Sequence, residues 1–489
     1  MPSMWQNKCH SGIVTFWHIF YFCDTNLINK RMFLFYVMPI IFLLGIILIA
    51  LEDITHINKA AVAVGMSILL WLICLLDAAG LFALHTPEYM DNFITGFPKF
   101  AALSPAEQAF RYVEGALVEA LGDVSTTLFF VLASMAIVEV LDSHGAFSVI
   151  TKSIRSKSKR RLVWIFGILT FILSALLGNL ATVIVMVAVL RKLVSNKSDR
   201  IIYACLTILT ANAGGSWSPI GDVTTLLLWT GGNLSVGHQI SHLILSSSLY
   251  AVTTCTIVSF MFPRGENISD VVLERANLPE YITHKYQTTL LIVGLCSLAM
   301  VPVLQSLFSL PPFMGVLFGL VVLWIITDIK AHKSHDSASK KLLVSNLFSK
   351  LDISTVLFFL GILMSVHSLK TVGFLTELSV GLNNLIGDPN TIGLLLGVCS
   401  SFLDNVALVA ASMGMYPIAE AGAFMADGTF WTFLAYCAVT GGSLLIIGSA
   451  SGVTVMGMEK ISFVYYLKKF SWIALISYAA GAAVYLLLF

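Results

Sequence analysis

The sequence predicts an all-α polytopic membrane protein, an inverted repeat of two five-helix halves, each with a re-entrant hairpin and a broken transmembrane helix. Three observations predict this fold: an apolar composition, the placement of basic residues, and polar phrases that occur twice. Of the 489 residues, 57% are hydrophobic and only 11% are charged, and the mean hydropathy is +0.88. Soluble domains carry about 25% charged residues. The chain is therefore expected to cross a membrane many times.

A helix that crosses the hydrocarbon layer needs about 20 apolar residues. Stretches of this kind predict ten spans, at about 33–51, 60–83, 112–140, 201–230, 239–262, 286–308, 312–328, 353–369, 429–456 and 471–489.

Basic residues set the predicted topology. One acid-free loop holds Lys152, Arg155, Lys157, Lys159, Arg160 and Arg161, a second holds Arg191, Lys192, Lys197 and Arg200, and five lysines lie between Lys330 and Lys350. By the positive-inside rule all three loops are cytoplasmic. The apolar stretch 162–190 lies between the first two loops, so it enters and leaves by one face, as a hairpin with Gly178-Asn179 at its tip and arms of about half a bilayer each. Counting onward predicts a second hairpin at about 389–416, with Asp404-Asn405 at its tip.

This topology divides the chain into two repeats. The first covers 33–262 and the second 286–489, with a linker at 263–285 between them. Because 112–140 runs opposite to 353–369, the repeats are inverted. Residues 1–32 form an N-terminal extension that is a signal-like segment, or translation begins at Met32 or Met38.

Three polar phrases recur in the same order. Asp123-Val-Ser-Thr-Thr-Leu-Phe-Phe returns 229 residues later from Asp352, Leu177-Gly178-Asn179 returns 226 residues later as Leu403-Asp404-Asn405, and Gly214-Gly215-Ser216 with Gly221 returns 227 residues later as Gly441-Gly442-Ser443 with Gly448. Many transporters are built from such repeats, with a site where glycine-interrupted segments meet near the midplane. Non-helical backbone survives at that depth only inside protein or a watery cavity. We therefore expect both tips and both breaks to line one central site.

Other functions are disfavoured. The sequence has no G-x-x-x-x-G-K-[ST] loop and no soluble domain large enough for a nucleotide, so an ion gradient is expected to drive transport. The eight cysteines form no Cys-x-x-Cys pair and are interpreted as packing residues. No cofactor is expected. Short basic loops between spans are normal, so they indicate no nucleic-acid partner.

Two carboxylates are the main candidates for cation and proton exchange. A charge near the bilayer centre costs about 2.5–3.5 kcal/mol on insertion scales, so each needs a reason. Asp404 lies at the second tip, where it holds a cation or a proton, or caps the next helix arm, or does both. Asp222 follows a break of two glycines, a proline and another glycine. There its oxygens and the exposed carbonyls suit a small cation, with a capped helix restart as the alternative.

Several neutral residues are expected to coordinate the ion or line the site, and the symmetric pair of asparagines has a structural role as its alternative: Asn179, Asn405, Asn212, Thr224, Thr225, Ser400, Ser443 and Ser449.

Other polar residues have simpler interpretations. Asp123 and Asp352 are predicted as helix caps, although Asp123 with Glu119 and Glu114 is the candidate ion access path. Glu139, Asp142 and His144 are expected to be solvated, with a proton relay as the alternative. His367 is expected to be a packing histidine.

The motifs resemble NhaD-type sodium/proton antiporters of the ion transporter superfamily over about residues 33–489. The resemblance rests on Gly-Gly-Ser-Trp-Ser-Pro-Ile-Gly-Asp-Val-Thr-Thr ending at Thr225, Leu-Asp-Asn-Val-Ala-Leu-Val-Ala-Ala-Ser-Met-Gly-Met-Tyr ending at Tyr416, and Gly-Gly-Ser-Leu-Leu-Ile-Ile-Gly-Ser-Ala-Ser-Gly ending at Gly452. It implies exchange of sodium or lithium for protons across the bacterial cytoplasmic membrane in pH homeostasis, and a homodimer. Matching positions place Asp222, Thr224, Thr225, Asn179, Asp404 and Asn405 at the transport site.

One position departs from the family, which usually carries Asp where this chain has Gly178. Losing an acid is expected to lower the number of protons per cation or to change the ion preference. Two rival functions remain. One is a sodium-coupled carrier or exporter of a small anion such as a dicarboxylate or arsenite, since helix ends bind anions. The other is an intramembrane hydrolase using Ser218 or Ser443, which lacks a recognisable base.

Overall fold

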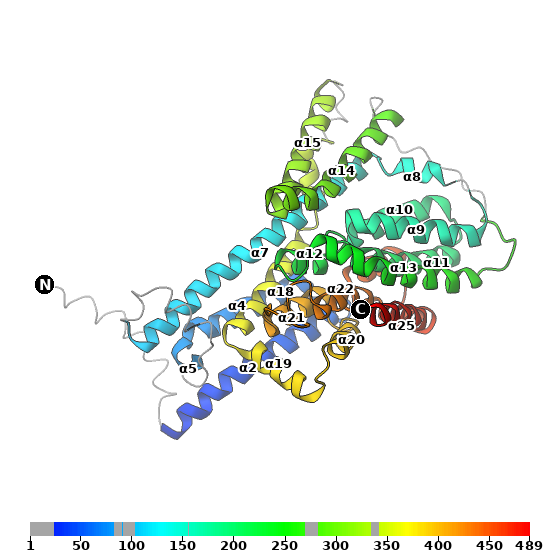
Figure 1. Cartoon of the computed structure of the whole chain (residues 1–489). Coiled ribbons are helices and arrows are strands. Elements are labelled where there is room, and N and C mark those ends of the chain that lie inside the picture. The colour runs from blue at the N-terminus through cyan, green and yellow to red at the C-terminus, as the bar shows by residue number, and fades with distance from the viewer. Residues whose placement is uncertain (1–23, 83–89, 91–102, 155, 269–281, 334–341) are drawn as a thin grey trace.

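The computed structural model describes residues 24–82, 90, 103–154, 156–268, 282–333 and 342–489, and these residues are mostly helical (Figure 1). The helices of the first half are α2 (Asp24–Ala50), α3 (Glu52–Thr55), α4 (Lys59–Leu76), α5 (Ala78–Phe82), α7 (Pro105–Ser143), α8 (Ser148–Ser153), α9 (Lys159–Leu177), α10 (Asn179–Leu193), α11 (Lys197–Ser216), α12 (Val223–Thr230) and α13 (Val236–Phe260).

The second half contains α14 (His284–Phe308), α15 (Pro312–Lys333), α17 (Val344–Leu347), the short 3-10 helix η2 (Phe348–Lys350), α18 (Ile353–Thr371), α19 (Phe374–Leu385), α20 (Pro389–Cys399), α21 (Asn405–Met415), α22 (Thr429–Gly441), α23 (Ala450–Glu459), α24 (Phe463–Lys469) and α25 (Ser471–Leu488).

Eight of the described helices are long and apolar enough to cross a membrane: α4, α7, α9, α13, α14, α15, α18 and α25. Seven of them match predicted spans, and α9 is the additional one. Their exposed apolar side chains, such as Phe318 and Ile325, suit contact with lipid. The chain is a multi-pass membrane protein, as expected from its composition.

The long helix α7 corrects one expectation. It begins after Ser104, whose hydroxyl accepts from the Glu107 backbone N–H while the Glu107 carboxylate accepts from the Ser104 N–H, a reciprocal cap that fixes the start of the helix. Its 39 residues span about 58 Å. Asp123 therefore lies inside the helix and caps nothing, whereas Asp352 caps α18 through Thr355 as predicted.

Both predicted helix breaks are present. The chain leaves helical geometry between α11 and α12, and again between α22 and α23. A Cβ on Gly215 would lie 2.6 Å from the Gly221 carbonyl oxygen, and one on Gly442 would lie 2.9 Å from the Gly448 oxygen. Each break folds back so tightly on the preceding helix that only glycine fits.

The hairpin tips lie where the sequence predicts them. The arms α9 and α10 meet at Gly178, and α20 and α21 flank the turn that ends at Asp404. With 11 residues each, α20 and α21 are about 16 Å long, roughly half a bilayer. The 19 residues of α9 extend about 28 Å, longer than predicted. How deep each hairpin enters the membrane stays a prediction.

The two halves use their repeated residues in the same way. Ser174 on α9 donates to the Ala211 carbonyl of α11 at 2.5 Å, and Ser400 on α20 donates to the Ala438 carbonyl of α22 at 2.7 Å. Gly214 also faces the α9 backbone, as Gly441 faces the α20 backbone. Each hairpin is thus fastened to its own broken helix by equivalent contacts.

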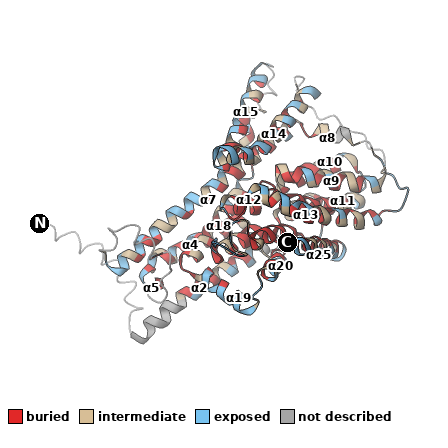
Figure 2. Ribbon diagram, viewed as in Figure 1, coloured by how far each residue is buried: buried red, intermediate tan, exposed pale blue. Residues whose placement is uncertain are grey.

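The helices form two groups, each drawn from both halves (Figure 1). A peripheral group contains α2, α4, α7, α14, α15 and α18, and a central group contains α9–α13, α20–α23 and α25. Figure 2 shows buried residues concentrated in the central group, while α7, α14 and α15 expose more surface. The broken helices α11 and α22 pack together and are buried almost all round, so the breaks lie in the protein interior.

Candidate functional site

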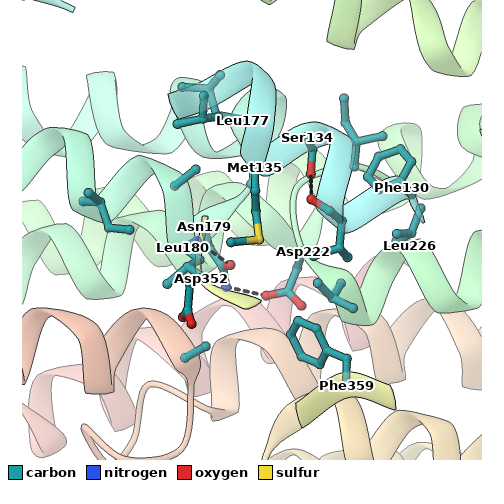
Figure 3. Close-up of a pocket in the computed structure, with 18 of the residues that line it drawn as sticks. Phe130, Ser134, Met135, Leu177, Asn179, Leu180, Asp222, Leu226, Asp352 and Phe359 are labelled. Atoms are coloured by element: carbon teal, nitrogen blue, oxygen red, sulfur yellow. Dashed lines mark hydrogen bonds between the residues drawn. The ribbon is translucent and has the colours of Figure 1, made fainter. Parts of the chain in front are cut away.

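Asp222 occupies the point where three elements meet. It caps α12, with its Oδ1 accepting from the Thr224 backbone N–H at 2.7 Å, and its residue surface is only 5% exposed. The Asn179 side-chain amide from the first tip donates to the same carboxylate (Figure 3). The Asn405 amide from the second tip donates to it at 3.3 Å. A single buried carboxylate therefore joins both tips and the first break.

Asn212 on α11 connects the two halves behind this carboxylate. Its Oδ1 accepts from Asn179 at 3.0 Å and from the Ser451 hydroxyl at 2.7 Å. Its Nδ2 donates to Ser443 at 2.8 Å and to Ser449 at 3.0 Å. The predicted convergence of tips and breaks is thus visible as one hydrogen-bonded network.

Asp404 lies beside this network at the second tip. It caps α21, accepting from the Val406 N–H at 2.9 Å, so the capping interpretation is correct. Its carboxylate also borders a cavity of about 190 Å³ that reaches Asp222, Asn179 and Asn405. Capping and facing a cavity coexist in the same side chain.

The outer part of this larger site cavity is charged. Glu139, Asp142, Lys350 and Asp352 line it, together with apolar residues that include Phe130 and Phe359 (Figure 3). The Lys350 ammonium lies 3.3 Å from a Glu139 carboxylate oxygen and donates to the Ser143 hydroxyl at 2.8 Å. This ion pair joins the end of α7 to the start of its repeat counterpart α18.

A second cavity of about 510 Å³ is lined by Asp123, Thr126, Asn233, His367 and Lys370, among others. Residues of α7, α12, α18 and α21 line both cavities. Along each of these helices, the residues of the second cavity are displaced along the chain from those of the first. The two cavities therefore lie in series along one bundle of four helices.

The structure sorts the predicted site residues. Asp222, Asp404, Asn179 and Asn405 border the site cavity, and Asn212, Ser443 and Ser449 form the network behind it. Thr225 and Ser400 are different, because their hydroxyls donate to backbone carbonyls and border no described cavity. Asp123 lines the second cavity, whereas Glu119 is exposed on α7 outside it.

Thr224 has a distinct environment. Its hydroxyl faces the Asp222 carboxyl, yet within the described part of the chain it completes no hydrogen bond. A buried polar oxygen without a partner is costly. Such an oxygen beside a carboxylate is available to a desolvated cation.

Two histidines differ from expectation. His144 is fully buried at the end of α7, with Nδ1 2.8 Å from the Val140 carbonyl oxygen, so it is not a solvated interface residue. His367 is half-buried on α18 and lines the second cavity, so it is not a pure packing residue. Both depend on how α7 and α18 pack, which local sequence does not specify.

Gly178 adopts a conformation that explains its residue type. Its φ of 84° and ψ of 152° lie in a region that is essentially restricted to glycine. At the equivalent position, Asp404 has an ordinary φ of −58° and ψ of 133°. The tips share a sequence phrase but have different backbones, and each half carries one carboxylate: on the break in the first, on the tip in the second.

Sequence reasoning missed two lysines near the site. Lys350 was assigned to a loop used only to set topology, and Lys59 was counted as the flank of a span. No local pattern separates such a lysine from an ordinary interface residue, because its position relative to Asp404 depends on the packing of α4.

A bundle of apolar helices around one buried polar site, with cavities on the way to it, defines a membrane transporter. Residues 36–433 match the family described as Citrate transporter, and the chain belongs to this family. Among relatives, "Sodium/proton antiporter 1" of Arabidopsis thaliana is 41% identical over 76% of this chain, which spans 63% of that protein. "Sodium/proton antiporter 2" of the same plant is 35% identical over 92% of this chain and 98% of its own.

A bacterial relative, "Na(+)/H(+) antiporter NhaD" of Alkalimonas amylolytica, is 28% identical over 76% of this chain and 79% of its own. The expected resemblance to NhaD-type proteins is confirmed. The relatives are named as transporters, so the chain is a transporter and not an enzyme. In agreement, Ser218 donates to the Ala175 carbonyl, which leaves its hydroxyl proton engaged by backbone.

Proposed function

We propose that this chain exchanges sodium, or lithium, for protons across a membrane, with Asp222 and Asp404 as the exchanging carboxylates. One observation carries the proposal: Asp222 is buried where both repeats meet and shares a cavity with Asp404. A buried carboxylate is stabilised by a cation or by a proton, and the two compete for it. That competition couples their movements without ATP.

The neighbours of Asp222 suit a small cation. Sodium is a hard ion that prefers oxygen ligands. The Asp222 carboxylate and the Thr224 hydroxyl supply oxygens directly, and the Asn179 and Asn405 amides supply oxygens after rotation about their last bond. Without an ion, the amide N–H groups neutralise part of the carboxylate charge.

The two cavities suggest the route. We infer that the site cavity opens to the cytoplasm and that the cavity with Asp123 leads to the other face. A rocking movement of the central group against the peripheral group would open one and close the other. Asp123 then serves as the access residue, and Glu119 lies farther out on the same helix.

The relatives' names support sodium/proton exchange, while the family description names citrate. A citrate or dicarboxylate anion fits this site poorly, because Asp222 and Asp404 would repel it and Lys350 is the cation among the residues bordering the site cavity. We therefore keep anion transport as the alternative.

We also propose the finer architecture: inverted repeats at 33–262 and 286–489, two re-entrant hairpins and a homodimer. The bacterial cytoplasmic membrane stays a prediction too, since the two plant relatives are more similar to this chain than the bacterial one.

The test is proton release in inverted vesicles from antiporter-deficient bacteria, followed with a pH probe. We expect sodium or lithium to release protons from vesicles with the wild-type protein, and Asp222→Asn and Asp404→Asn to abolish the response. Asp388→Asn is the matched control, since Asp388 caps α20 through Thr391 as Asp404 caps α21, but lies outside the site. Well-expressed protein that answers no cation, yet takes up an anion, would favour the alternative.

A further inference from the structure

A third, small cavity of about 50 Å³ lies on the other side of Asp404. Glu52, Lys59 and Asp404 are the charged residues that line it, together with Phe358 and Ser449. Asp404 borders both this cavity and the larger site cavity, whereas Lys59 borders only the small one and Asp222 only the large one. The carboxylate of Asp404 is thus placed between a lysine and the second acid.

The position of Lys59 is costly by itself. It is the first residue of α4, where the positive end of the helix dipole disfavours a cation by about 0.3–1 kcal/mol. Its ammonium lies 5.1 Å from the ring centroid of Phe358, a buried side chain of the same cavity. This cation–π contact directs the ammonium toward the cavity. The ammonium and the Asp404 carboxyl interact electrostatically there.

Glu52 does not replace Asp404 as the partner of this charge during transport. Its Oε1 accepts from the Lys59 backbone N–H at 3.1 Å, which holds Glu52 at the start of α4. It does not border the site cavity, so an ion or proton bound at Asp222 leaves its charge unchanged. The other charged residues of the site cavity, Glu139, Asp142, Lys350 and Asp352, are exposed or half-buried at its outer part and also stay constant.

We propose that Lys59 is a built-in counter-ion of Asp404 that sets the exchange at one proton per sodium. This inference rests on the proposed function and adds the stoichiometry. With Lys59 and Asp404 paired, Asp222 carries the one uncompensated charge. One proton neutralises it in one direction of the cycle and one sodium in the other, so no net charge crosses the membrane. Without the lysine, Asp404 requires a proton of its own, and two protons exchange for one sodium.

The stoichiometry is measured in proteoliposomes with the membrane potential held at zero by valinomycin and equal potassium on both sides. A tenfold proton gradient is imposed, and the opposing sodium gradient is varied until an internal pH dye shows no proton flux. We expect a null at a tenfold sodium gradient for the wild type and at a hundredfold gradient for Lys59→Met. Lys59→Arg keeps the charge and should stay at tenfold.

Lys350→Met is the matched control, because Lys350 is a lysine of the site cavity that pairs with Glu139 and not with Asp404. Its null should remain at tenfold. A wild-type null at a hundredfold gradient, or a tenfold null in Lys59→Met, overturns the role of Lys59 and leaves sodium/proton exchange intact. Absence of any sodium-driven proton flux in the wild type refutes the proposed function itself.

If Lys59→Met does not fold, the wild type still decides the question. An electroneutral exchanger keeps its null when a potential is imposed through a potassium gradient. A null that moves with the potential contradicts a one-to-one exchange.

Discussion

At the scale of single residues, the two hairpin tips show how the same phrase serves different ends. Asp404 combines a helix cap with a place on the site cavity, while Gly178 forms a turn that side chains rarely adopt. The absence of the family's usual Asp at this position is therefore linked to backbone geometry. Restoring the acid meets a conformational cost.

We expect Gly178→Asp to lower stability by about 1–3 kcal/mol, because aspartate must adopt φ 84° or the tip must rearrange. Thermal unfolding in detergent measures this. Gly457→Ala is the control, since that glycine has an ordinary φ and nothing within 4 Å of an added Cβ. Equal melting temperatures for the two variants would show that the tip tolerates a side chain.

Asn212 is the second informative residue, since it bonds to both repeats through four hydrogen bonds. Its repeat counterpart is Val439, so the network exists once in the molecule. Asn212→Val should cost about 1–3 kcal/mol, because buried hydroxyls of Ser443 and Ser449 lose their donor. We also expect a raised sodium KM in vesicle exchange; an unchanged KM would make Asn212 purely structural.

At the scale of elements, each broken helix depends on close backbone contact with its hairpin. A Cβ on Gly441 would lie 2.0 Å from the Gly397 carbonyl oxygen of α20, so Gly441→Ala must push these helices apart. Overpacking of this kind typically costs about 1–3 kcal/mol. We expect a lower melting temperature and loss of exchange, whereas Gly122→Ala, in open space on α7, should keep both.

A further link joins the repeats through the buried Glu459 at the end of α23, which accepts from Arg191 and Arg200 at 2.7 Å each. Burial raises its pKa, but the hydrogen bonds and charges of the two arginines outweigh burial and hold the pKa below the ordinary value. A depressed carboxyl pKa gives stability above the unfolded pKa that is lost as pH falls through the folded one.

We therefore expect Glu459→Gln to lower stability at neutral pH by about 1.5–3 kcal/mol, the range for hydrogen bonds to charged groups. The difference from wild type should shrink in acid, below about pH 4, where the wild-type carboxyl also becomes protonated. Melting temperatures measured from pH 4 to pH 8 test this. A difference that does not change with pH would mean that the charge of Glu459 contributes little.

At the scale of the whole molecule, two cavities in series along α7, α12, α18 and α21 suggest access from opposite faces. Thr126 and Ser134 lie on the same helix, eight residues apart, and each borders one of the two cavities. In a background without native cysteines, we expect an impermeant thiol reagent to modify Ser134→Cys from the cytoplasmic side and Thr126→Cys from the other. Modification of both from one side would contradict this route.

The sequence by itself determined the membrane class, the two hairpins and two helix breaks, and the carboxylates Asp222 and Asp404. Hydropathy, glycine spacing and repeated phrases report local structure, and these features are local. Tertiary structure alone decided that Asn212 joins both halves, that Gly178 needs its unusual conformation, that Asp123 lies inside a long helix, and that Lys59 reaches Asp404. These depend on contacts between residues often more than 200 positions apart, which arise when helices pack and which no local pattern encodes.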